Sequence, residues 1–126
     1  ARQRNACKNH RTETERRLSM TYDDIKNLLD ECNLPYAYDH FAEGESPDPP
    51  FICLLLPGSD NFSADGIVYQ KIDQVRIELY TDIKDPEIEE IVEAVLDKHG
   101  IFYDKSEVWI DSEEMYEVMF SFEIRR

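Results

Sequence analysis

A cysteine and a histidine, Cys53 and His40, are the side chains most able to form a nucleophilic pair in this sequence. Both lie in stretches predicted to be strands, and adjacent strands could bring a thiol next to an imidazole that takes its proton. Cys53, however, lies inside the apolar run FICLLL, where a cysteine is typically a small buried side chain. Nothing in the local sequence would lower the pKa of its thiol. We therefore expect no catalytic residue here.

A polar stretch, PGSDNFSADG (57–66), carries aspartate and asparagine ahead of a glycine, as calcium loops do. A loop of the EF-hand type places oxygen ligands at alternate positions before that glycine. Counted from Asp60, these positions hold Phe62 and Ala64, whose side chains cannot coordinate a cation. The proline and two glycines are typical of a long connection between strands. We expect a loop here and no metal site.

The other polar residues form no recognisable motif. Asp and Glu number 28 in 126 residues, so a close carboxylate pair is expected by chance and predicts no acid–base chemistry. The four glycines are isolated, which excludes a glycine-rich phosphate loop. The three cysteines are widely spaced without a CxxC pair, which argues against a disulfide framework or zinc site and favours a reducing compartment. We expect no enzyme and no cofactor.

Charge divides the chain near position 19. Residues 1–19 hold six Lys/Arg and two Asp/Glu, which gives a net charge of +4. Residues 20–126 hold eight Lys/Arg and 26 Asp/Glu, which gives −18, so the net charge of the whole chain is −14. So acidic a domain is repelled by nucleic-acid phosphates, and we expect no specific binding of nucleic acid. Residues 1–19 contain almost no large apolar side chains and are predicted to be a basic arm that is disordered or not native. Residues 20–126 form one predicted domain.

No apolar run reaches the roughly 18 residues that a membrane helix needs, and no apolar stretch follows the basic start as it does in a secretory signal. We therefore expect no association with a membrane.

Apolar spacing and helix-end signals predict two helices. Thr21 is a capping residue before 22–32, where apolar side chains recur at helical spacing. Asp85 and Pro86 start a second helix over 86–99, which ends before a glycine. Strand-forming runs occupy 36–41, 51–57, 67–80, 101–111 and 115–124. The order α-β-β-β-α-β-β predicts an α+β fold, a mostly antiparallel sheet with both helices on one face.

Four aromatic side chains are candidates for a subunit interface, because aromatic residues are enriched there. Packing between sheet and helix explains them equally well. They are Tyr69, Tyr80, Tyr103 and Trp109.

Residues 20–124 resemble small prophage proteins of Gram-positive bacteria that are encoded among the head–tail connection genes and are similar to the tail terminator, or tail completion, family of long-tailed phages. The resemblance lies in the overall string and the order of elements, and no residue's role can be transferred by motif. The stretches that carry it are TYDDIKNLLDECNLPYAYDHF, PPFICLLLPGSDNFSADGIVYQKIDQVRIELYTD and DPEIEEIVEAVLDKHGIFYDKSEVWIDSEEMYEVMFSFEI.

The resemblance implies an α+β protein that forms a hexameric ring, ends the tail tube and offers a docking surface to the filled head. Its partners would be itself, the tail tube protein and the head–tail connector protein, in the virion neck and, during assembly, the host cytoplasm. Long loops in such rings contact the tube or line the channel. The corresponding partner-facing residues here would be Ser59, Asp60, Asn61, Phe62 and Asp65. A head-closure or minor capsid protein, a metal-dependent or thiol enzyme, and a non-catalytic cytoplasmic interaction module remain as alternatives.

Overall fold

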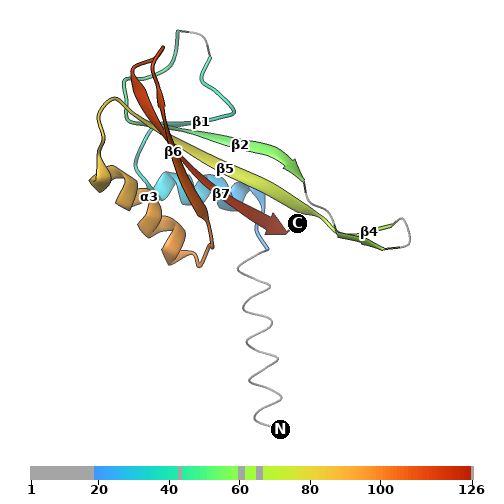
Figure 1. Cartoon of the computed structure of the whole chain (residues 1–126). Helices are drawn as coiled ribbons and strands as arrows, with labels where there is room; N and C mark the ends of the chain where they lie inside the picture. Colours follow the sequence, from blue (N-terminus) through green and yellow to red (C-terminus); the bar gives the residue numbers. More distant parts are fainter. Residues whose placement is uncertain (1–18, 43, 60–61, 65–66, 126) are drawn as a thin grey trace.

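The computed structural model describes residues 19–125, apart from 43, 60–61 and 65–66. Within these ranges the chain forms two layers, a twisted sheet and a pair of helices that both cover one of its faces (Figure 1). This confirms the predicted α+β fold. The elements are α2 (Tyr22–Glu31), β1 (Tyr36–Tyr38), β2 (Phe51–Ser59), β3 (Phe62–Ala64), β4 (Ile67–Gln70), β5 (Ile72–Thr81), α3 (Pro86–Lys98), β6 (Asp104–Ile110) and β7 (Met115–Arg125).

The main sheet has five strands in the order β1-β2-β5-β7-β6. Its longest ladder joins β5 to β7, where Ile77 lies opposite Phe120. All its pairs are antiparallel except β1 with β2, which run parallel. The parallel pair was not predicted, because the periodicity of a strand does not reveal the direction of its partner.

Both helices begin where their capping signals predict. The hydroxyl of Thr21 accepts a hydrogen bond from the backbone N–H of Asp24, whose carboxylate accepts one from the N–H of Thr21, so the two form a capping box. The side chain of Asp85 accepts from the N–H of Ile88, and Pro86 takes the first helical position. After α3 the chain turns at Gly100, whose φ of +68° favours glycine.

The core lies between the helices and one face of the sheet. On each strand the alternate positions face the helices, as the period of two requires. Its fully buried large side chains are Ile25, Leu28, Leu29, Ile52, Leu54, Val75, Ile77, Leu79, Val92, Leu96, Val118 and Phe120. The run from Phe51 to Leu54 is buried on both of its faces, as its unbroken apolar sequence predicts.

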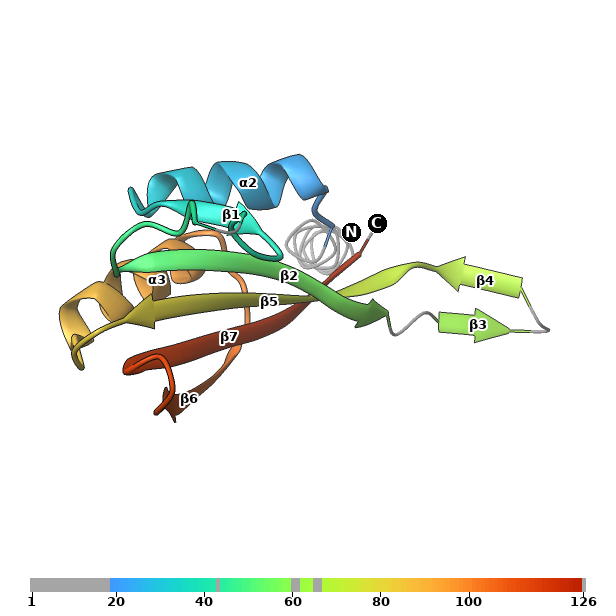
Figure 2. The same ribbon diagram turned by 90° about the horizontal axis from the view of Figure 1, so that it is seen from above.

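The stretch from 57 to 80 differs from the prediction. The chain predicted as one strand over 67–80 is two strands, β4 and β5, separated at Lys71. The stretch predicted as a loop contains the end of β2 and all of β3, which pairs with β4. This β3–β4 ribbon extends beyond the ends of β2 and β5 (Figure 2). Turn residues and an acidic composition hid this short pairing from a sequence-based assignment.

The remaining predicted boundaries need smaller corrections. The strand predicted over 36–41 ends at Tyr38, because Asp39 has a φ of 68° and leaves the extended region. The strand predicted over 101–111 is Asp104–Ile110. Ser19, assigned to the arm, forms an isolated bridge with Arg125, whereas the rest of the predicted arm lies outside the described residues. Within the described ranges, no helix is both long and apolar enough to cross a membrane.

Candidate functional site

The face of the sheet opposite the helices is left uncovered by the described helices (Figure 2). It carries the alternate positions that do not enter the core, and it mixes apolar, polar and charged side chains. We call it the open face. Its central members are Phe51, Cys53 and Leu55 of β2, Arg76, Glu78 and Tyr80 of β5, Glu117, Met119 and Ser121 of β7, and Ser106 and Val108 of β6.

A buried carboxylate lies in the middle of the open face. Glu78 is only 6% exposed, and its two oxygens lie 2.8 Å from the Tyr80 hydroxyl, which donates to it, and 2.9 Å from Nε of Arg76. Burial and a hydrogen bond with Glu78 raise the pKa of Glu117 to about 7. Glu117 therefore keeps its proton to a higher pH than an ordinary glutamate does, which relieves the repulsion between adjacent negative charges.

Aromatic rings cover the end of the open face nearest to β1. Phe51 stacks on Tyr80 with ring centroids 5.1 Å apart, and Phe41 meets Phe51 edge to face at 5.4 Å. Burial and the bond to Glu78 raise the pKa of the Tyr80 hydroxyl, so it remains a donor. This end of the face is therefore packed by the chain's own residues rather than free for a partner.

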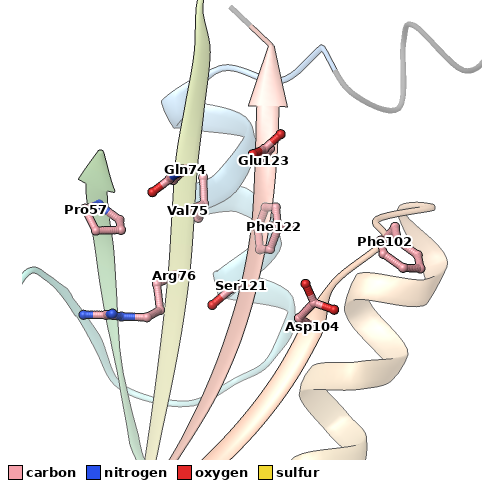
Figure 3. A pocket seen from close by; sticks show the side chains of 9 residues that line it. All are labelled: Pro57, Gln74, Val75, Arg76, Phe102, Asp104, Ser121, Phe122 and Glu123. Carbon is pink, nitrogen blue, oxygen red and sulfur yellow. The ribbon is translucent and has the colours of Figure 1, made fainter. Parts of the chain in front are cut away.

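The other end of the open face forms a shallow hollow of about 510 Å³ (Figure 3). Its walls include Pro57 of β2, Gln74 and Arg76 of β5, Ser121 of β7 and Asp104 of β6. Among the described residues, no cluster of three or more His, Cys, Asp or Glu side chains could hold a metal ion. The mixed lining is suited to contact with a polar protein surface.

The candidate nucleophile and base have separate neighbours. His40 is exposed and its Nδ1 lies 2.8 Å from a carboxylate oxygen of Asp39. Cys53 is buried, and burial raises the pKa of its thiol to about 11. A thiol with so high a pKa forms almost no thiolate at neutral pH, so this geometry does not favour covalent catalysis.

The predicted partner-facing loop lies at the β3–β4 ribbon. Ser59 is the exposed last residue of β2, and Phe62 is the first residue of β3. Asp60, Asn61 and Asp65 lie outside the described residues. The structure therefore places only Ser59 and Phe62 of this set, at the junction of β2 with the β3–β4 ribbon, and the role of the set in binding stays a prediction.

The four candidate interface aromatics lie in three different places. Tyr69 belongs to β4, and Tyr80 lies on the open face against Phe51. Tyr103 lies just before β6 and Trp109 near its end, both on the side of the helices; Tyr103 packs on Phe120, and Trp109, 48% exposed, packs on Tyr116. The structure brings only this last pair to one edge, and their role in an interface stays a prediction.

The buried carboxylate pair was missed by the sequence analysis. Alternation in IELY places Glu78 on the side away from the core, where exposure to water is expected. Its burial depends on Arg76, Tyr80 and Glu117, and the last of these comes from a strand some forty positions later in the chain. No local signal in the sequence indicates such a neighbour.

Comparison with protein-family models finds no match, and neither does comparison with curated proteins. Among solved structures, the chain is similar to one from the "Virion of native gene transfer agent (GTA) particle", with a TM-score of 0.54 and 13% sequence identity. The likeness covers 78% of this chain and 82% of that chain. At this identity it shows a shared fold.

Proposed function

We propose that this chain is a structural protein of the head–tail junction of a long-tailed phage or prophage. Copies of it would form a ring, with six members by the resemblance, that ends the tail tube and offers a docking surface to the filled head. The observation that carries the proposal is the likeness of fold to a chain of a gene transfer agent virion across most of both chains. The resemblance of its sequence to tail terminator proteins is the reason why we propose the head–tail junction rather than another part of the virion.

Two features of the structure support assembly into a larger particle. The β3–β4 ribbon projects beyond the main sheet, so a neighbouring protein can contact it without disturbing the core (Figure 2). The open face combines apolar and charged side chains over four strands, which is typical of protein interfaces. We assign the ribbon to contacts with the tail tube protein or the channel, and part of the open face to contacts with other subunits or the head–tail connector protein.

The acidity of the domain fits a ring through which DNA passes. The whole chain carries a net charge of −14, and the ribbon region includes Asp60 and Asp65. Like charge keeps phosphates from binding to the wall of a channel, so the genome can slide through it. The protein acts in this proposal as a non-catalytic component, located in the virion neck after assembly in the host cytoplasm.

Deletion of the gene from its parent phage or prophage tests this proposal, with electron microscopy of the induced particles as the readout. We expect filled heads without tails beside free tails of excessive length. Leaking heads beside normal free tails would instead indicate a head-closure protein or a minor capsid protein of the neck. Normal infectious particles would contradict any role in the virion and favour a cytoplasmic interaction module. Expression of the chain from a plasmid must restore normal particles.

A further inference from the structure

Strand β6 forms an unprotected edge of the main sheet. Among the described residues it pairs with β7 alone, and six of its seven residues are exposed. Edge strands in natural proteins are usually short, bulged or interrupted by proline, because their free N–H and C=O groups pair readily with another chain. β6 has seven residues, no proline and an unbroken register with β7. It is therefore open to a further strand.

Exposed apolar side chains gather along the same edge. Phe102 is 87% exposed just before β6, Val108 is 43% exposed and Trp109 is 48% exposed. They lie on or beside one strand, whereas scattered single apolar residues are normal on a surface. A partner strand along β6 would cover part of all three.

The strand is complementary to a second copy of itself. In an antiparallel pair of strands, residues directly opposite each other lie on the same face of the sheet. When a two-fold axis relates two copies of one strand, opposite residues are therefore an even number of positions apart, and one residue lies opposite its own copy at the axis. With the axis at Ser106, Lys105 lies opposite Glu107 of the second copy, and this pairing of opposite charges occurs twice. The further pairs in this register are Asp104 with Val108, Tyr103 with Trp109, and Phe102 with Ile110.

Neighbouring registers are less favourable. An axis at Asp104, Lys105 or Glu107 places two identical charges directly opposite each other, which is destabilising. An axis at Val108 sets Glu107 opposite Trp109 and leaves Phe102 and Tyr103 without partners.

The existing ion pairs also suit the Ser106 register. Lys105 lies 2.8 Å from Glu89 and 3.2 Å from Glu93, and Glu107 pairs with Lys84. Lys105 and Glu107 remain 34% and 37% exposed, so each can contact a further charge. Across the axis, positive and negative groups would alternate in one continuous row.

We propose that β6 pairs with β6 of a second copy of this chain, antiparallel and with Ser106 at the two-fold axis, to join two main sheets into one. This contact uses Tyr103 and Trp109, the two interface candidates that the structure brings to one edge. It does not rest on the proposed function. An isologous contact closes on two copies, so a ring needs a different surface between its subunits.

Disulfide trapping tests the register in the full chain with Cys7→Ser, which leaves the buried Cys32 and Cys53 as the native thiols. A Ser106→Cys variant brings two thiols to the axis, within the Cα separation that a disulfide needs. In a Val108→Cys variant the two thiols lie more than about 13 Å apart. With diamide as oxidant, we expect Ser106→Cys to form covalent dimers and Val108→Cys to form none. A mixture of Asp104→Cys and Val108→Cys chains should form mixed dimers.

Monomeric Ser106→Cys under these conditions would overturn the proposal, and efficient dimers of Val108→Cys would overturn the register.

A second measurement uses charge at one exposed position. In the Ser106 register Val108 lies opposite Asp104 of the second copy. Val108→Asp then creates two like-charge pairs, and Val108→Lys creates two attractive ones. By sedimentation velocity we expect Val108→Asp to raise the dimer dissociation constant about tenfold or more relative to Val108→Lys. Circular dichroism confirms that both variants fold. Equal dissociation constants for the two folded variants would contradict the pairing.

Discussion

At the scale of single residues, the main departure from expectation is the buried acidic pair on the open face. Glu78 has three neighbours that are charged or polar, namely Arg76, Tyr80 and Glu117. A carboxyl group that is partly buried beside a second carboxylate binds its proton more tightly in the folded chain than in the unfolded chain. This pair therefore makes the stability of the fold depend on pH near neutrality.

We expect Glu117→Gln to stabilise the protein at pH 8. The pKa of Glu117 is about 7 in the folded chain, against an ordinary value of 4.5. Between these two values the folded chain binds more protons than the unfolded chain, so the free energy of unfolding falls as pH rises from about 4.5 through 7. An amide removes this loss, worth about 1–2 kcal/mol after screening by solvent. Urea unfolding at pH 5 and pH 8 measures it. The difference from the native chain should be much smaller at pH 5, which lies close to the ordinary pKa of 4.5, and Glu123→Gln, exposed on the same strand, is the matched control. A stabilisation of equal size at both pH values would contradict the assignment.

At the scale of elements, a buried glutamate of α3 joins this helix by ion pairs to other parts of the same chain. The side chain of Glu89 is 3% exposed and lies 2.7 Å from Lys84 and 2.8 Å from Lys105. Burial raises the pKa of this carboxyl, but the hydrogen bonds from Lys105 and Lys84 outweigh it, so the pKa lies below its usual range. Lys105 belongs to β6, so the interaction joins the helix to the edge of the sheet.

Lys105→Met should lower the free energy of unfolding by about 1–3 kcal/mol, because it leaves the buried Glu89 with one cation instead of two. Lys98→Met is the matched control. Lys98 is 68% exposed and pairs with Glu31 at 2.6 Å, so its loss should cost less than about 0.5 kcal/mol. Chemical denaturation at pH 7 compares the two. Equal effects would show that burial of Glu89 does not set the energy of this contact.

The capping box of α2 is a second contribution at this scale. Thr21→Ala removes the acceptor that lies 3.2 Å from the N–H of Asp24, and we expect a loss of about 1 kcal/mol. Ser112→Ala, in the exposed turn before β7, should leave the thermal midpoint unchanged. A similar midpoint for both variants would mean that the cap does not hold the start of this helix.

How far the sequence predicts the fold also depends on the element. Thr21, Asp85 and Pro86 act within one turn of chain, so both helix starts could be predicted. The break at Lys71 and the β3–β4 ribbon depend on which short segments pair, and the composition of 57–66 resembles that of a loop. The candidate site was predicted only in part, because the open face gathers residues from strands distant in sequence.

At the scale of the whole molecule, net charge governs association. Each chain carries −14 at pH 7, so any pair of copies repels before its contact surfaces meet. Salt shortens the range of this repulsion to roughly 10 Å at 0.1 M. We expect self-association, measured by sedimentation equilibrium, to strengthen between about 0.02 M and about 0.3 M sodium chloride. Association that weakens with salt would show that local ion pairs such as Lys105 with Glu107 outweigh the net charge.

The place of the chain in the particle is the central claim, and cryo-electron microscopy of purified virions tests it most directly. We predict a ring of copies between the last layer of the tail tube and the head connector, with density that fits the five-stranded sheet and its two helices. The β3–β4 ribbon should point toward the tube or the channel. Purified infectious particles in which mass spectrometry finds no copy of the chain, or density for it away from the neck, would contradict the proposed function.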